Sequence, residues 1–599
     1  MRLALIALVL PGLSFSQLIP AGQPVPKGPN PPVVFLNGYQ ASCTGVDFAG
    51  TFGAADKLLQ NNGLVSLFFD NCTVAGKPTL EGLGIAFGQY LAALKYTDGT
   101  PVTQVDVVSH SMGGLIVRSY LSGKQDTPTA SFLPPASVPI RKAVFLGTPN
   151  FGSLVAGQLG SDKQTAEMSL GSQFLFDLNT WNQGTDDLRG ISAISVAGNI
   201  GGRESGVGPG FDDGVVALTS ASLGFYRPGV TRIVPDCHTT NSLLILAGFC
   251  PSGAPTLASL STDPNNPVGQ ILLSFLAGTN TWKSVGEAAE TNSFLSGTAG
   301  LAVQLRDTDD ATISLIGGSI TSLTPAGKLT PNPASGIDTT EAVPAGKTDL
   351  QLTPLSGTAT NASIATMAGT VTPAIVKPGP AISPKGVIPA AGPAPFPYDV
   401  SPGAYVSIYG TNLSSATQTG SIPYPNQLAD VQVLVNGSAA PLVYVSTGQI
   451  NFVYPNVATG LTRLTVKTGA GQSSVNVRVA PAVPSIFLLD ANATAAARNA
   501  LTSVVVGASA PLRAGDFLSL YLTGLGATNL VSGLDYARTQ PTITIGGQNV
   551  DLLYAGRSPG FAGLDQINCQ IPAGIAGAAV PVIVTSGGRV SNTAFIAIQ

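Results

Sequence analysis

The chain divides into two parts by its pattern of apolar and polar positions. In the first part, short apolar runs rich in β-branched residues alternate with stretches whose apolar residues have helical spacing. The predicted strands are 65–69, 105–108, 143–146 and 191–197, and the predicted helices are 51–62 and 80–96. This alternation predicts an α/β domain with a mostly parallel sheet covered by helices. The carboxyl ends of the strands should then open onto one crevice.

Beyond about residue 282 the helical spacing gives way to period-two runs separated by Gly, Pro and Asn turns. Such runs predict all-β sandwich domains of the immunoglobulin type. We expect a β-rich domain over residues 290–372, followed by a stiff, extended linker over the Pro- and Ala-rich residues 373–400.

The last part contains an internal repeat. PGAYVSIYGTNL at 402 matches RAGDFLSLYLTGLG at 513, and GQINFVYP at 448 matches DQINCQIP at 565. Two similar β-sandwich domains, 401–486 and 487–599, are the simplest account. Four aromatic residues that alternate along the matched strands are expected in their cores: Tyr405, Tyr409, Phe517 and Tyr521.

The sequence VDVVSHSMGGLIVRSYL, from 105 to 121, has the layout of a nucleophile elbow. An apolar strand stops at Ser111, and glycines and an amphipathic stretch follow. Gly113 would allow close packing of strand and helix, and the N–H of Met112 would be free to bind an oxyanion. The usual pattern is Gly-x-Ser-x-Gly, but Ser109 occupies the first glycine position here. This motif predicts acyl transfer through a serine ester.

A second sequence, Gly556 to Gly560, satisfies the literal pattern around Ser558. No stretch of helical spacing follows it, however, and Pro559 lacks the N–H that an oxyanion hole requires from the residue after the nucleophile. The sequence context therefore favours Ser111 over Ser558 as the nucleophile.

A serine hydroxyl needs a base to take its proton, and the chain has only two histidines. The side chain of His110 should point away from that of Ser111, because neighbouring side chains diverge at a tight turn. His238 follows an apolar strand and is therefore the predicted base. The order Ser, acid, His then places the acid between residues 111 and 238.

Asp213, in GFDDGVVALTSAS, is the favoured acid because it stands at a loop start before a glycine and a short β-like run. Asp212 is the adjacent alternative, and Asp236 lies two residues before His238. Spacing alone leaves these three carboxylates open.

These motifs together resemble the secreted bacterial lipases and esterases of the α/β-hydrolase fold, over about residues 31–248. VVFLNGYQ at 33 is similar to the family's first strand and oxyanion loop, with Asn37 at the usual histidine position. KAVFLGTPNFGS at 142 is similar to its next turn, with Asn150 at another histidine position. MSLGSQFLFDLN at 168 and DGVV at Asp213 are two further segments that resemble this family.

The resemblance implies hydrolysis of ester or lipid substrates by Ser111, Asp213 and His238, without a cofactor. It also implies an oxyanion hole made by the N–H groups of Tyr39 and Met112. A short lid or substrate cleft would lie between residues 153 and 168. Some relatives bind calcium through an aspartate two residues after the histidine, but Thr240 stands there, so no metal is expected.

The opening PGAYVSIYGTNL also resembles IPT/TIG-type immunoglobulin-like domains, and GQINF resembles the carboxy-terminal module of many secreted bacterial proteins. Such domains either attach the enzyme to a cell surface or polymer, or serve as a spacer. The sequence leaves the partner and the oligomeric state open.

Composition adds two constraints. The chain has 599 residues and a net charge of −4 with 10% charged residues, which gives no indication of nucleic-acid binding. Residues 1–16 combine Arg2, an apolar stretch and small residues, which predicts a secretory signal peptide. The catalytic domain would then span 17–285, and the mature protein would be extracellular.

The cysteines agree with an oxidising compartment. Cys43 and Cys72 each follow a predicted strand, and adjacent parallel strands would bring them together. A bridge between Cys237 and Cys250 would stiffen the loop of His238. Four cysteines allow three pairings, so this pairing is a preference. Cys569 is expected to be a buried free thiol, and no cysteine–histidine spacing predicts a metal site.

Two classes of function follow. The first is a secreted serine esterase or lipase. The second is a non-catalytic surface or adhesion protein that uses a hydrolase-like scaffold, suggested by the departures at Ser109, Asn37 and Asn150.

Overall fold

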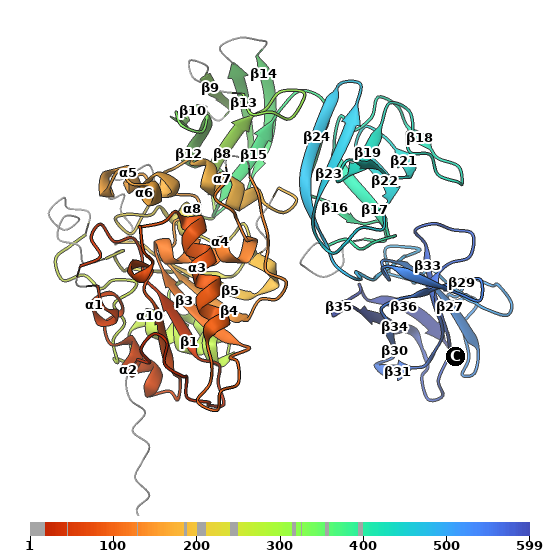
Figure 1. Ribbon diagram of the computed structural model, residues 1–599. Coiled ribbons are helices and arrows are strands. Elements are labelled where there is room, and N and C mark those ends of the chain that lie inside the picture. The colour runs from red at the N-terminus through yellow and green to blue at the C-terminus, as the bar shows by residue number, and fades with distance from the viewer. Residues whose placement is uncertain are drawn as a thin grey trace, which may run out of the picture.

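The structure, a computed structural model, describes residues 18–44, 46–127, 130–184, 188–200, 211–239, 250–313, 319–324, 326–353, 359–392 and 399–599. The predicted signal peptide lies outside these residues. The described chain forms an amino-terminal α/β domain, a β-rich region that packs on it, and two β-sandwiches (Figure 1). The predicted fold class, a hydrolase-like α/β domain followed by all-β immunoglobulin-like domains, is confirmed.

The α/β domain is built on a seven-stranded sheet that is parallel except for its last strand. In sheet order the strands are β2 (Ser66–Phe69), β1 (Val33–Leu36), β3 (Val105–His110), β4 (Ile140–Leu146), β5 (Ser192–Gly198), β6 (Thr231–Val234) and β7 (Glu287–Ala288). The antiparallel β7 lies beyond residue 285, where the sequence pattern placed the end of this domain.

Helices cover both faces of this sheet because its strands are apolar on both sides. Along β1, Val34 packs in one core with Phe87, whereas the next residue, Phe35, packs in the other core with Phe52. The helices of the first core are α3 (Leu80–Ala93), α4 (Met112–Ser122) and α7 (Gln173–Thr180), and those of the second are α1 (Phe48–Phe52), α2 (Ala55–Gln60) and α10 (Pro267–Ala277).

The β-rich region consists of two four-stranded sheets. Its strands are β8 (Thr298–Leu305), β9 (Ser319–Thr324), β10 (Ala326–Lys328), β11 (Thr330–Asn332), β12 (Ile337–Pro344), β13 (Gly346–Thr353), β14 (Thr360–Thr366) and β15 (Val371–Val376). Strands β8 and β12 contact the short helix α8 (Leu218–Ala221) of the α/β domain, where the Thr219 hydroxyl donates to the Glu341 carbonyl at 3.1 Å.

The predicted stiff, extended linker over 373–400 is wrong where strands occupy this segment. β15 extends to Val376, and β16 (Ala381–Pro389) pairs with the first strand of the next sandwich. β16 is an edge strand whose register shifts between Ile382 and Val387, and Pro384 lies in that irregular part. Edge and bulge positions tolerate proline because no ladder hydrogen bond is lost there, so a Pro-rich sequence can still be a strand.

Each of the two repeats forms a pair of packed sheets. The first has β17 (Tyr405–Thr411), β18 (Gln418–Thr419), β19 (Gln432–Val435), β20 (Ser438–Ala439), β21 (Leu442–Val445), β22 (Gln449–Val453), β23 (Gly460–Thr468) and β24 (Gly471–Val479). The second has β25 (Ser485–Ile486), β26 (Ala497–Asn499), β27 (Phe517–Thr523), β28 (Thr528–Val531), β29 (Leu534–Ala537), β30 (Thr542–Ile545), β31 (Gln548–Val550), β32 (Leu552–Arg557), β33 (Asp565–Gln570), β34 (Gly577–Ser586), β35 (Arg589–Val590) and β36 (Ala594–Ile598). The order β17–β22–β21 recurs as β27–β33–β32, as the sequence repeat requires.

The four alternating aromatic residues are not the core residues of these strands. Val406 and Ile408 fill the first core, while Tyr409 is 41% exposed. The second repeat follows the same rule, with Leu518 and Leu520 in its core. A strand turns alternate side chains to opposite faces, so the aromatic set lies on the outer face.

None of the helices in the described part of the chain combines the length and the apolar character that a membrane span requires.

Candidate active site

Ser111 lies at the turn between β3 and α4, with φ 54° and ψ −126°. A non-glycine residue with this backbone conformation is strained, as expected for a nucleophile elbow. Ser109 fits at the glycine position because its hydroxyl is buried and donates to the Val144 carbonyl at 3.2 Å. Gly113 is required, since a Cβ there would be 2.7 Å from the Leu36 carbonyl oxygen.

The structure brings together the three side chains that the sequence singled out. His238 Nε2 lies 2.9 Å from Ser111 Oγ, and His238 Nδ1 lies 2.7 Å from Asp213 Oδ2. The residues follow β3, β5 and β6, whose carboxyl ends share one edge of the sheet. Ser111 is partly exposed, whereas His238 and Asp213 are buried.

The surroundings of the carboxylates distinguish Asp213 from its neighbours. Asp213 Oδ1 accepts the N–H groups of Val215 and Val216 at 3.0 and 2.8 Å, which leaves Oδ2 for the imidazole. Asp212 instead accepts the N–H of Gly214 at 2.7 Å. Asp236 is buried, and its burial raises its pKa to about 6. Asp213 is the carboxylate that contacts the His238 ring.

His110 has a role that the sequence reasoning missed. Its Nε2 lies 3.0 Å from the His238 carbonyl oxygen, so this nitrogen must carry the proton and donate. The two imidazole rings lie 4.8 Å apart between centroids. Burial lowers the pKa of His110 to about 3, so the side chain is a neutral hydrogen-bond donor that ties down the main chain of His238. The sequence signal for this role is the position of His110 as the last residue of a buried strand.

The N–H groups proposed for the oxyanion hole are those of Tyr39 and Met112. Within the part of the chain that the structure describes, neither Tyr39 nor Met112 donates its N–H to a protein acceptor. A Cβ built on Gly38 would be 2.9 Å from Ser111 Cβ, so the loop before Tyr39 lies directly against the nucleophile. Met112 is the first residue of α4, where a helix leaves its N–H groups unpaired.

A cavity of about 520 Å³ opens at this site. Its lining combines polar residues such as Gln40 and Ser153 with apolar ones such as Met168 and Val216. The segment between residues 153 and 168 contributes to this lining through α5 (Ala156–Leu159) and α6 (Lys163–Met168).

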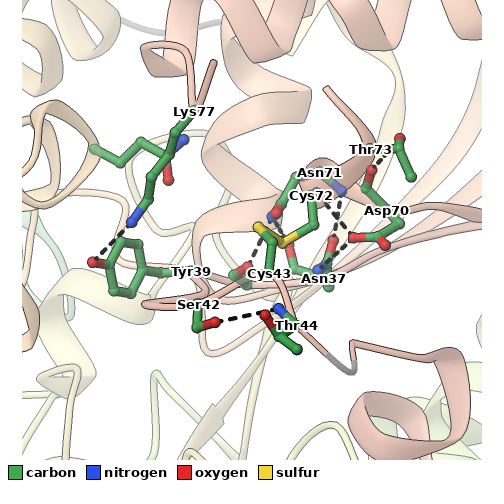
Figure 2. The surroundings of a disulfide bond; sticks show 12 residues. Asn37, Tyr39, Ser42, Cys43, Thr44, Asp70, Asn71, Cys72, Thr73 and Lys77 are labelled. Carbon is green, nitrogen blue, oxygen red and sulfur yellow. Dashed lines mark hydrogen bonds between the residues drawn. A yellow bond between two sulfur atoms is a disulfide. The ribbon is translucent and has the colours of Figure 1, made fainter. Parts of the chain in front are cut away.

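Asp162 connects the segment between residues 153 and 168 to the loop of Tyr39. Asp162 Oδ2 accepts the Tyr39 hydroxyl at 2.9 Å and forms an ion pair with Lys77 at 2.5 Å. Lys77 also lies over the Tyr39 ring, 4.8 Å from its centroid (Figure 2). The hydrogen bond to Asp162 raises the pKa of Lys77, which therefore stays charged.

Both preferred disulfides are present. Cys43 is bonded to Cys72 beside the Tyr39 loop (Figure 2), and Cys237 is bonded to Cys250 beside His238. Cys569 is a buried free cysteine whose pKa is raised to about 12 by burial. The position of Thr240 lies outside the described residues. No group of three metal-binding side chains occurs among the residues that the structure describes.

Besides Ser109, the two other departures from the lipase pattern are buried polar residues with several partners. Asn37 donates to Asp70 at 3.2 Å and accepts from the N–H of Asn71 at 3.0 Å. Asn150 accepts from the Arg118 guanidinium at 2.9 Å and donates to the carbonyl of Ala221 at 3.3 Å. Each asparagine therefore joins neighbouring segments by hydrogen bonds.

Comparisons with known proteins match parts of the chain. A search of curated proteins found no match to the sequence. Among solved structures, phospholipase PlaB from Legionella pneumophila has a TM-score of 0.43 at 15% identity, covering 58% of this chain and 93% of that one. The lin2722 gene product from Listeria innocua has a TM-score of 0.24 at 15% identity, covering 41% and 94%. A glucan-utilisation protein, SGBP-B from Bacteroides ovatus, has a TM-score of 0.19 at 15% identity, covering 51% and 60%.

A family model gives a match within the all-β part. Residues 394–479, which overlap the first sandwich repeat, match the model of the IPT/TIG domain. The carboxy-terminal half of the chain thus contains a TIG domain.

Proposed function

We propose that the protein is an extracellular serine hydrolase that cleaves carboxylic esters, as lipases and esterases do. The observation that carries this proposal is the unbroken series of contacts from Ser111 through His238 to Asp213, at 2.9 and 2.7 Å. The series supplies a nucleophile, a base and an orienting carboxylate in hydrogen-bond reach of one another. Two disulfides support an oxidising compartment outside the cytoplasm.

The mechanism follows from this geometry. Ser111 Oγ attacks the ester carbonyl carbon while its proton passes to His238 Nε2, and Asp213 accepts the Nδ1 proton in a hydrogen bond. The carbonyl oxygen becomes an oxyanion bound by the N–H groups of Tyr39 and Met112. The proton on Nε2 then passes to the leaving alcohol, which leaves an acyl-serine. Water, deprotonated by the same imidazole, attacks this ester and releases the acid and the free serine.

The cavity supports a neutral ester as substrate. Its described lining residues include no lysine or arginine, and they include Asp47. Among the described lining residues, an anionic phosphate group would therefore find no lysine or arginine partner. The mixed polar and apolar lining fits an ester whose acyl and alcohol parts differ in polarity.

The alternative function, a non-catalytic surface protein, was suggested by the departures from the lipase pattern at Ser109, Asn37 and Asn150. The side chains of all three have hydrogen-bond partners within the α/β domain, and none of the three lies among the residues that line the cavity. The contacts of these side chains therefore give no support to a disabled site.

The experiment that tests the proposal is hydrolysis of p-nitrophenyl butyrate by the full chain and its Ser111→Ala variant. We expect kcat to fall by roughly 10⁴-fold or more, because the acyl-enzyme can no longer form. Labelling by a fluorophosphonate probe should be lost in parallel. Ser558→Ala is the matched control, since Ser558 lies in the second Gly-x-Ser-x-Gly sequence. Activity retained in Ser111→Ala would refute the mechanism.

A further inference from the structure

The buried side chain of Asn71 forms hydrogen bonds to the loop that carries Tyr39 (Figure 2). Asn71 Nδ2 donates to the Gly38 carbonyl at 2.8 Å and to the Asn37 carbonyl at 3.2 Å. The Asn71 main-chain N–H also donates, to Asn37 Oδ1 at 3.0 Å. Two successive peptide groups of the loop are therefore fixed by one residue of a different segment.

Fixing the Gly38 carbonyl also fixes the direction of the Tyr39 N–H. The two groups belong to the same planar peptide unit, which is trans, so they point in opposite directions. The carbonyl is held on the Asn71 side, and the N–H is therefore directed away from it. Because Gly38 lies against Ser111 and both Gly38 and Tyr39 line the cavity, the aim of this N–H depends on the Asn71 amide.

The segment that carries Asn71 is itself held firmly. Asn71 begins a 3₁₀ turn, Asn71–Thr73, at the end of β2, and Asp70 caps it by accepting the Cys72 N–H at 2.9 Å. Asp70 Oδ1 also accepts from the Asn37 side-chain amide at 3.2 Å. The Cys43–Cys72 disulfide then joins the residue after Asn71 to the loop that follows Tyr39. A covalent bond and a set of hydrogen bonds thus connect the same two segments.

We propose that Asn71 is a positioning residue for the oxyanion hole, and that the Cys43–Cys72 disulfide keeps its amide in register with the Gly38 carbonyl. This inference rests on the proposed ester hydrolysis. It assigns to Asn71 a role in transition-state stabilisation, although the side chain touches neither substrate nor nucleophile. An oxyanion donor that is misdirected binds the ground state as before but stabilises the tetrahedral intermediate less well.

The test uses the full chain with Asn71→Asp, which keeps the size of the side chain but replaces the donating amide by a carboxylate oxygen. We expect kcat for p-nitrophenyl butyrate to fall by about 10- to 100-fold, somewhat less than for outright loss of a donor, with KM changed less than about twofold. Phenylboronic acid, which forms a tetrahedral adduct with the serine hydroxyl, should bind more weakly by a similar factor. A merely structural role would lower the Tm without this parallel loss.

Two further variants keep the outcome decisive. Asn62→Ala is the matched control, because Asn62 Nδ2 also donates to a main-chain carbonyl, that of Leu58 at 2.8 Å, at the end of α2. The Cys43→Ser, Cys72→Ser double variant leaves Asn71 intact and is expected to shift kcat and boronate affinity in the same direction, by about threefold or more. If Asn71→Asp does not fold, this double variant tests the proposed role of Asn71 in its place.

The outcomes separate this inference from the proposed function. If Ser111→Ala is inactive while Asn71→Asp, or the disulfide variant in its place, keeps wild-type kcat and boronate affinity, the role of Asn71 is refuted and the hydrolase stands. If Ser111→Ala stays active, the proposed function fails, and this inference fails with it.

Discussion

At the scale of single residues, the site is organised by hydrogen bonds to the main chain around the nucleophile and base. Asn71 holds the loop of Tyr39, and His110 holds the carbonyl of His238. Both side chains are buried, so each hydrogen bond is made where water cannot replace it. The positions of the groups at the site therefore depend on neighbouring residues that take no direct part in the reaction.

A prediction at this scale concerns His110. Its pKa of about 3 lies below the ordinary value of 6.5, so the unfolded chain binds an extra proton between these two values. His110 therefore costs stability as the pH falls through this range, and the cost is absent above it. We expect His110→Gln, which keeps a donor for the His238 carbonyl, to lose less Tm than the wild type between pH 7 and pH 4. Thermal unfolding followed by circular dichroism measures this.

His110→Leu is the companion variant. Removing the donor leaves the His238 carbonyl unpaired in a buried site, at a cost of about 1–3 kcal/mol. We expect kcat to fall about tenfold with an unchanged KM, because the imidazole is less well placed. Equal kcat in His110→Leu and the wild type would show that this bond does not position the base.

At the scale of elements, the β-rich region packs on the α/β domain close to the loop that carries Asp213. Strand β12 packs on α8, which follows the loop of Asp213. The Glu341 side chain on β12 is buried, and within the described residues its Oε1 has no hydrogen-bond partner. Burial, with a smaller contribution from the charge of Asp212, raises the pKa of Glu341 to about 8.

This pKa predicts a loss of stability at alkaline pH. The folded state holds a proton on Glu341 that the unfolded chain releases above about pH 4.5, so stability declines as the pH rises from there to about 8. Glu341→Gln removes the need for this proton. We expect its Tm to exceed that of the wild type at pH 9, by roughly 2–4 °C for each kcal/mol gained, and to match it at pH 4. A difference that does not vary with pH would contradict this assignment.

At the scale of the whole molecule, the domains contact one another through specific bonds. In the α/β domain, the Gln183 N–H donates to the Asn476 carbonyl at 2.7 Å, and Gln183 Oε1 accepts the Val387 N–H at 3.0 Å. Asp399, which pairs with Arg478 at 2.8 Å within the first sandwich, also forms an ion pair with Arg589 of the second sandwich. These contacts favour a rigid arrangement over freely jointed domains.

A truncation tests this arrangement. A fragment of residues 18–291 keeps β7 but loses β12 and the contacts of Gln183. We expect it to unfold at a lower temperature than the α/β domain within the full chain, as measured by calorimetry. Its rate of p-nitrophenyl butyrate hydrolysis should be less affected well below its Tm, because the described residues lining the cavity all lie before residue 260. An identical Tm would show that the β domains contribute no support.

The sequence by itself determined the elements and the residues of chemical interest. Apolar runs specified the strands of the parallel sheet, the elbow motif singled out Ser111, and the repeat predicted two similar sandwiches, because each of these is encoded in local periodicity or spacing. Only the tertiary structure decided which carboxylate faces His238, that 373–400 holds an edge strand, and that Asn71 and His110 hold the site. These depend on contacts between segments distant in the chain, where burial and hydrogen-bond geometry are set by the fold and not by local spacing.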